Sequence, residues 1–181
     1  MYEEQIQKPS KTMWRLLPVL LIGSLYVTQQ TTGFCNQSVI DLTDKKTSQS
    51  SNFANKYSRL TNADKAIDGN RSTCSLTLIN SSSWWTIDLL GVHNISCVCI
   101  YNQNCSSLNL KPAQIYIGNS PNNVKLAYNI TNFTAGQINV FQFPKSVIGR
   151  FVKVIREGQQ AMVLCDVNIT GTPLEPPYCE D

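Results

Sequence analysis

AIDGNRSTCS (residues 66–75) and WWTIDL (residues 84–89) decide the fold that this sequence predicts. The first stretch places a carboxylate, a glycine, hydroxyl side chains and a cysteine close together, and its Asp-Gly-Asn favours a tight turn. The second stretch is rich in the aromatic and β-branched residues that favour strands. Together they predict one half of an oxygen-rich cation site on a β-sandwich.

The rest of the chain repeats short strand-like segments. Runs of β-branched and aromatic residues recur about every ten residues, separated by turn residues such as 118–123 and 157–158, without long helical periodicity. This spacing predicts an all-β jelly-roll β-sandwich. Upstream we expect a short strand at 38–42, a polar tract at 43–55 and a helical turn at 62–66. The later strands are expected at 84–89, 95–101, 113–117, 124–128, 138–142, 149–155 and 161–169.

The N-terminal residues have the pattern of a processing segment. Lys8, Lys11 and Arg15 precede an apolar run at 16–27, which is short for a membrane span and typical of a signal peptide. The alternative is an uncleaved N-terminal anchor at the cell surface. Either a signal peptide or an anchor would place the C-terminal domain outside the cytosol, because the positive charges precede the apolar run. The expected organisation is a leader at 1–33, a β-sandwich domain at 34–172 and an extended tail at 173–181.

Composition excludes several classes of function. The formal net charge is only +3, and no basic run or zinc-finger spacing is present, so a nucleic-acid partner is not expected. The single histidine, His93, reads as a loop residue, and the sequence has neither G-x-S-x-G nor C-x-x-C. Nucleophilic and zinc catalysis therefore lack support, and we expect neither an enzyme nor an enzyme substrate.

Sequons and cysteines agree with a secretory protein. Seven cysteines in an oxidising compartment allow up to three disulfides and leave one free thiol or an intermolecular bridge, so an oligomer is possible. Cys179 could reach back to Cys35. Cys97 and Cys99 alternate along one strand and so face one side, and one of them could pair with Cys105. Eight N-x-[ST] sequons are typical of a glycosylated secretory protein, and one of them begins at Asn70. The candidate glycosylation sites are the other seven, Asn36, Asn80, Asn94, Asn104, Asn129, Asn132 and Asn168.

The order of these motifs resembles that of the F-type lectins (fucolectins). That family opens with A-[IV]-D-G-N, then [ST]-C-S, then W-W-x-[IV]-D-L, and the fragments at 95–102, 114–120, 149–154 and 164–167 follow in the family's order. The resemblance covers roughly residues 40–172. It implies a galactose-binding-domain-like sandwich with a carbohydrate-binding site and a structural calcium ion.

Carried over by position, the resemblance implies a Ca²⁺ site and one disulfide. Calcium prefers six to eight oxygen ligands and accepts carbonyls beside carboxylates. The disulfide would join Cys74 to Cys165 across the site. The alternative is that 68–70 is only a β-turn. The implied ligands are the carbonyl oxygens of Lys65, Asn70 and Cys165 and the side chains of Asp68, Thr73 and Asp166.

The resemblance also shows that the family's sugar-binding groups are replaced. Leu76 stands at the position of a histidine, Gln103 near an arginine and Asn104 near an aspartate, with no further arginine before Lys111. We therefore expect fucose binding to be weakened or lost. A different, neutral sugar remains one interpretation, ordinary solvated loop residues another, and a glycan on Asn104 could cover the pocket. The expected ligand-binding positions are Leu76, Gln103, Asn104 and Leu108.

Two functions remain open. The first is a secreted, calcium-binding, lectin-like module that recognises an extracellular glycan or glycoprotein. The second is an extracellular adhesion or structural protein on the same scaffold that binds no sugar.

Overall fold

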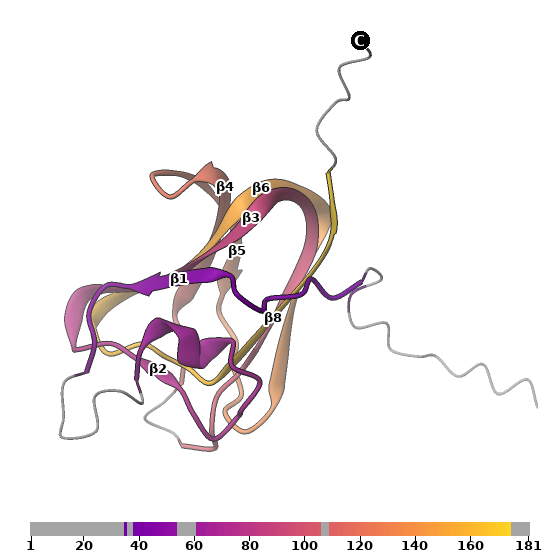
Figure 1. Cartoon of the computed structure of the whole chain (residues 1–181). Helices are drawn as coiled ribbons and strands as arrows, with labels where there is room; N and C mark the ends of the chain where they lie inside the picture. Colours follow the sequence, from indigo (N-terminus) through magenta and orange to yellow (C-terminus); the bar gives the residue numbers. More distant parts are fainter. Residues whose placement is uncertain (1–34, 36–37, 54–60, 106–108, 175–181) are drawn as a thin grey trace, which may run out of the picture. The chain divides into compact units, whose positions relative to one another are not determined.

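The computed structural model describes residues 35, 38–53, 61–105 and 109–174 (Figure 1). All of them belong to the unit that spans 33–181. The predicted leader at 1–33, the sequon at Asn36, Leu108 and most of the predicted tail lie outside the described residues. Among those described, no helix has the length and apolar character needed to span a membrane.

The described part of the chain is almost entirely β-structure, as predicted. The only helix among the described residues is the 3₁₀-helix η2, Ala63–Ala66, at the predicted helical turn. The strands are β1 (Lys46–Gln49), β2 (Ser75–Leu76), β3 (Asn80–Tyr101), β4 (Ala113–Ser120), β5 (Asn123–Ile130), β6 (Ile138–Gln160), β7 (Val163–Leu164) and β8 (Asp166–Pro173).

Two long antiparallel strands, β3 and β6, build both layers of the sandwich. In Figure 1 they arch together over the domain, and their pairing is interrupted between Asp88 and His93, where the arch turns. Before this turn β3 pairs with β1 and with the second half of β6, which continues to β4 and β5. After it, β3 pairs with β8 and with the first half of β6. The jelly-roll sandwich predicted from the sequence is confirmed.

The core lies between these layers and follows the period-two alternation of the strands. Trp85, Ile87 and Leu89 are fully buried, and the Trp85 indole N–H donates to the Ala63 carbonyl at 2.9 Å, which fixes η2 against the sheet. Trp84 points to the other face, where the Lys153 ammonium lies 4.8 Å from its ring centroid. WWTIDL thus places one tryptophan in the core and the other on the flank.

A bulge in β3 changes which side chains face the core. Its register against β8 shifts between Ile95 and Cys97, so that Ile95, Val98 and Ile100 belong to the core cluster. Cys97 and Cys99 flank Val98 along the strand and therefore occupy the opposite face.

The strand boundaries differ from the predicted ones in several places. The segments 84–89 and 95–101 are halves of β3, 138–142 and 149–155 are halves of β6, and 161–169 is divided into β7 and β8. Instead of a strand at 38–42 there is one bridge, from Val39 to Thr170. His93 is a buried residue of β3 rather than a loop residue, and Pro173, which we expected in the tail, ends β8.

Strand β1 lies inside the polar tract at 43–55, where we predicted no strand. It has no apolar side chain, and its exposure alternates between exposed and half-buried. It is an edge strand, held by main-chain pairing to residues 85–88 of β3. Main-chain hydrogen bonds do not depend on apolar side chains, so the sequence pattern could not reveal it.

Candidate functional site

The turn that carries Asp68 begins directly after η2. Gly69 has a φ of +72°, a conformation that other residues adopt only with strain, and the Asp68 carboxylate accepts the Asn70 N–H at 3.0 Å. The Asn70 side chain in turn accepts the Ser72 N–H at 3.0 Å. This Asp-Gly-Asn turn fixes the position of the Asp68 carboxylate.

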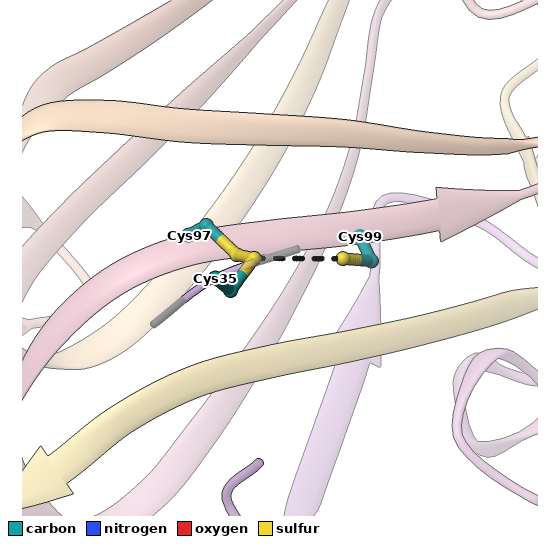
Figure 2. Close-up of side chains that lie close together, drawn as sticks. All are labelled: Cys35, Cys97 and Cys99. Atoms are coloured by element: carbon teal, nitrogen blue, oxygen red, sulfur yellow. Dashed lines mark hydrogen bonds between the residues drawn. A yellow bond between two sulfur atoms is a disulfide. The ribbon is translucent and has the colours of Figure 1, made fainter. Parts of the chain in front are cut away.

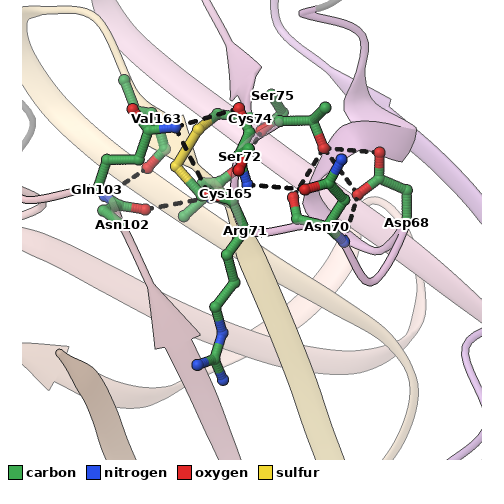
Figure 3. Close-up of a disulfide and its surroundings, with 12 residues drawn as sticks. Asp68, Asn70, Arg71, Ser72, Cys74, Ser75, Asn102, Gln103, Val163 and Cys165 are labelled. Carbon is green, nitrogen blue, oxygen red and sulfur yellow. Dashed lines mark hydrogen bonds between the residues drawn. A yellow bond between two sulfur atoms is a disulfide. The ribbon is translucent and has the colours of Figure 1, made fainter. Parts of the chain in front are cut away.

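Three oxygen acceptors of this turn converge on one hydroxyl (Figure 3). Thr73 Oγ1 lies 2.9 and 2.7 Å from the two carboxylate oxygens of Asp68 and 2.8 Å from the Asn70 carbonyl oxygen. A hydroxyl carries one proton, so it can donate to only one of these acceptors at a time. The cluster therefore holds more oxygen lone pairs than donors, which is the donor chemistry that suits a hard cation.

Asp68 is ionised at neutral pH. Burial opposes its ionisation, but hydrogen bonds from Thr73, from the Asn70 N–H and from Lys65 together hold the pKa of Asp68 below its ordinary value. Lys65 Nζ lies 3.3 Å from Asp68 Oδ2. Lys65 therefore supplies a cation to this carboxylate in the structure.

Asp166 faces a different set of partners. Its carboxylate accepts from Arg71 Nε at 3.0 Å and from the Asn168 side-chain amide at 3.2 Å. The Arg71 guanidinium also lies 5.0 Å from the Tyr101 ring centroid and points away from the Asp68 cluster in Figure 3. Within the described residues, no hydrogen bond links Asp166 to Asp68, Asn70 or Thr73.

The structure contains a disulfide between Cys74 and Cys165. It joins the end of the Asp68 turn to the start of β8, over a sequence separation of 91 residues. Cys74 and Cys165 stand next to Thr73 and Asp166 respectively. The disulfide thus connects the two segments that supply the predicted calcium ligands.

Asn102, the residue directly after β3, anchors the same region. It is fully buried, its amide donates to the Val163 carbonyl at 2.8 Å, and its side-chain oxygen accepts the Cys165 N–H at 3.3 Å. Its carbonyl accepts the Gly136 N–H at 2.8 Å. Asn102 therefore positions the loop that begins at Gln103 against β7 and the disulfide.

A pocket of about 260 Å³ lies beside the disulfide and brings two predicted ligand-binding residues together. Leu76 and Gln103 both line it, and Gln103 Nε2 donates to the Ser72 carbonyl at 3.1 Å. Asn104 is exposed on the adjoining loop but does not line the pocket, and Leu108 lies outside the described residues. The complete lining is Thr61, Ser72, Thr73, Cys74, Leu76, Gln103 and Val163, none of which carries a charge.

A second pocket, of about 290 Å³, adjoins the carboxylate of Asp166. The residues on either side of Asp68 in the turn, Ile67 and Gly69, line it from one side, and 166–168 of β8 line it from another. The N-terminal segment 39–43 closes the third side. This pocket and the oxygen cluster around Thr73 together define the end of the sandwich at which calcium was predicted.

Sequence analysis missed the positioning roles of Asn102 and Arg71. A polar residue at the end of an otherwise apolar strand was a signal for Asn102, because a buried amide requires hydrogen-bond partners. For Arg71 the sequence held no signal, since its partner Asp166 lies 95 residues away. Thr61 and Val163 were also missed, because they are far in sequence from Gln103, which lines the same pocket.

The sequons differ in how far their side chains are free to carry a glycan. Asn129 and Asn132 are exposed, as are Asn70 and Asn104. Asn80, Asn94 and Asn168 are half-buried, and the Asn168 amide is engaged with Asp166.

Comparison with known proteins agrees with this architecture. Residues 65–154 match the family described as a NedA-like, galactose-binding domain of F5/F8 type C. Fucolectin-4 of Anguilla japonica is 30% identical over 177 residues, which cover 89% of this chain and 96% of the relative. The chain belongs to the fucolectin family.

Solved structures share this fold. A fucolectin from the serum of striped bass (Morone saxatilis) superimposes with a TM-score of 0.67 and 28% identity, over 74% of this chain and 49% of that chain. The present chain thus spans about half of the striped bass lectin's length. A fucose-binding module of Streptococcus pneumoniae, SpX-3, gives a TM-score of 0.62 and 26% identity, over 73% and 96% of the two chains.

Proposed function

We propose that this chain is an extracellular lectin-like module that binds a neutral glycan in the pocket between Leu76 and Gln103. In this proposal its affinity for fucose is weak or absent, and a calcium ion stabilises the binding end of the sandwich. The observation that carries the proposal is the uncharged lining of a pocket located beside the Cys74–Cys165 disulfide.

The pocket offers both kinds of contact that a saccharide uses. Leu76, Val163 and Cys74 provide an apolar wall for the C–H face of a sugar ring, and Thr61, Ser72 and Thr73 provide polar groups. Because Gln103 Nε2 is occupied by the Ser72 carbonyl, the side chain is oriented and its Oε1 can accept from a sugar hydroxyl.

The replaced residues argue against fucose. By the family resemblance, Leu76, Gln103 and Asn104 stand where a histidine, an arginine and an aspartate would act. Hydrogen bonds from charged groups contribute roughly 1.5–3 kcal/mol each, so losing several of them lowers an affinity by orders of magnitude. Of the three substitutes, Gln103 and Leu76 line the pocket, and both are neutral.

Calcium is proposed on the chemistry of the oxygen cluster. Asp68, the Asn70 carbonyl and Thr73 would supply three ligand groups, and Asp166 and the carbonyls of Lys65 and Cys165 the others. The ion would take over from Lys65 and Arg71, which neutralise the two carboxylates in this structure. A ligand that binds only the native state stabilises it by mass action, by about 2.7 kcal/mol at one hundred times its dissociation constant.

Calcium removal tests this part directly. Addition of EDTA to the oxidised, calcium-loaded protein should lower its melting temperature, and Asp68→Asn should abolish the effect of calcium. Asp88→Asn, which changes a carboxylate of β3 outside the proposed ligand set, is the control. An unchanged melting curve on chelation would contradict a calcium site.

An extracellular location is supported by several features. The apolar run at 16–27 follows positive residues, sequons are numerous, and exposed Asn129 and Asn132 can carry glycans. The two disulfides among the described residues require an oxidising compartment to form and persist. Secretion into medium with glycosidase-sensitive mass is the expected result in eukaryotic cells.

A glycan array with the full-length protein secreted from eukaryotic cells tests the ligand. We expect binding to one or a few non-fucosylated glycans, lost in Gln103→Ala and retained in Gln159→Ala, which changes an exposed glutamine of β6. Fucose-agarose binding that free fucose competes would show that the fucose site is intact. Failure to bind any glycan would favour the non-sugar adhesion function instead.

A further inference from the structure

Three cysteine sulfurs meet on the face of β3 opposite the core cluster, where Cys35 and Cys97 are nevertheless buried. Cys35 and Cys97 form a disulfide, and the thiol of Cys99 lies 3.9 Å from the Cys35 sulfur (Figure 2). All three sulfurs lie within 4.8 Å of one another. The Cys35–Cys97 pair replaces the sequence-based alternatives, which joined Cys35 to Cys179 and one cysteine of β3 to Cys105.

We propose that Cys35, Cys97 and Cys99 form an intramolecular thiol–disulfide exchange site, in which the disulfide of Cys35 moves between Cys97 and Cys99. The Cys99 thiolate attacks the Cys35 sulfur, the Cys35–Cys99 bond forms, and Cys97 leaves as a thiolate that takes up the proton released from Cys99. One disulfide and one thiol stand on each side of the reaction, so no external oxidant or reductant is consumed.

The geometry favours Cys99 as the attacking group. A disulfide bond is about 2.05 Å long, so the Cys99 sulfur has to approach Cys35 by only about 2 Å. Both cysteines of β3 project from the same face, because only Val98 separates them and it points into the core. Rotation about side-chain bonds can therefore deliver either sulfur to Cys35 while β3 keeps its pairing.

The two disulfides constrain the chain almost equally. The sequence separation is 62 residues for Cys35–Cys97 and 64 for the Cys35–Cys99 contact, so the two loops have nearly the same closure entropy. The chain-entropy term therefore favours neither bond, and local packing determines the ratio. The Cys97 side chain is fully buried, whereas the Cys99 side chain is half-buried. Burial of the bonded pair therefore favours Cys35–Cys97, the disulfide of the structure.

Access to the reacting groups limits the chemistry to these three residues. Cys35 and Cys97 are buried, so a bulky external thiol reaches neither, whereas Cys99 already touches Cys35. Burial raises the pKa of the Cys99 thiol, and the nearby Asp166 carboxylate adds to this effect. Both keep the thiolate fraction small at neutral pH and make the exchange slow.

Exchange would move the anchor of the N-terminal segment along β3. Two residues of a strand span about 6.6 Å. The segment that follows Cys35 pairs with β8 through the Ile40 N–H to Ile169 carbonyl bond, 2.8 Å, and then lines the pocket beside Asp166. The two disulfides thus define two attachments of a segment that borders the proposed calcium end.

Mapping of the free thiol tests the proposal. The full-length secreted protein is held at pH 8, quenched in acid, unfolded and alkylated, and the label is located by fragmentation of non-reduced peptides. We expect label on Cys97 as well as on Cys99, together with both Cys35–Cys97 and Cys35–Cys99 cross-linked peptides. Label on Cys99 alone, with Cys97 always bonded, would overturn the proposal.

Two variants separate exchange from mispairing during folding. Cys99→Ser should retain Cys35–Cys97 as a single species with no label on Cys97. Cys97→Ser should form Cys35–Cys99 and leave neither residue open to alkylation. If Cys35 and Cys99 of Cys97→Ser both carry the label after the same acid quench, unfolding and alkylation, Cys99 does not reach Cys35 and the exchange site does not exist.

Discussion

Arg71 and Asp166 are bound to each other across 95 residues of sequence, with Arg71 Nε 3.0 Å from Asp166 Oδ2. This ion pair joins the Asp68 turn to β8 at the same place as the Cys74–Cys165 disulfide. It also occupies the carboxylate that calcium would need. The guanidinium would therefore compete with the proposed calcium ion for Asp166.

Arg71→Gln is expected to raise the calcium affinity. Loss of the guanidinium frees Asp166 and removes one positive charge near the ion, and an exposed ion pair contributes up to about 1 kcal/mol, which corresponds to roughly a two- to fivefold tighter dissociation constant. Calorimetric titration measures it, with Arg150→Gln as the control. Weaker calcium binding by Arg71→Gln would mean that Arg71 supports the site instead.

The Cys74→Ala/Cys165→Ala double variant is expected to lose stability. In the chain-entropy model, a disulfide that closes a loop of this length contributes about 4–5 kcal/mol, because it restricts the unfolded chain. Urea unfolding of the wild type and the variant measures the difference in the free energy of unfolding. A loss below about 1 kcal/mol would show that the proposed calcium end is held by other contacts, such as those of Asn102.

Trp85→Ala and Trp84→Ala form a matched pair that tests the orientation of WWTIDL. Trp85 is fully buried and bonded to Ala63, so its truncation should cost about 3–5 kcal/mol of unfolding free energy. Trp84 is half-buried and contacts Lys153, so its truncation should cost about 1 kcal/mol. Chemical denaturation of both variants and the wild type under the same conditions measures the two losses of unfolding free energy. Equal losses would contradict the assigned faces of Trp84 and Trp85.

Acid should selectively remove the contribution of Asp88. Arg150 donates to both carboxylate oxygens, at 2.6 and 2.7 Å, and this pairing outweighs burial and lowers the pKa of Asp88 below its ordinary value. A lowered pKa gives stability that is present above the unfolded pKa, near 3.8, and is lost as the pH falls through the folded pKa.

The measurement is the difference in unfolding free energy between wild type and Asp88→Asn as a function of pH. It should be constant, at about 0.5–1 kcal/mol, between pH 6 and 8, and should decline towards zero below pH 4. Asp44→Asn, an exposed carboxylate with no ion pair among the described contacts, is the control. A difference that persists in strong acid would assign the effect to something other than ionisation.

The sequence by itself determined the fold class and the turn that carries Asp68. The aromatic and β-branched residues of 84–89 predicted a strand there, because these residues favour strands. The turn at 68–70 followed from its Asp, Gly and Asn, since these residues favour turns whatever surrounds them. The family's motif order pointed to Cys74 and Cys165, which the structure joins.

Only the tertiary structure decided which distant groups meet. β1 became a strand through main-chain pairing to β3, although its own residues are polar. Cys35 met Cys97 and Cys99 because a bulge turned both cysteines of β3 outward, and Arg71 met Asp166 because the turn and β8 lie together. Local sequence encodes which face of an element is buried, whereas contacts between elements depend on how the whole chain packs.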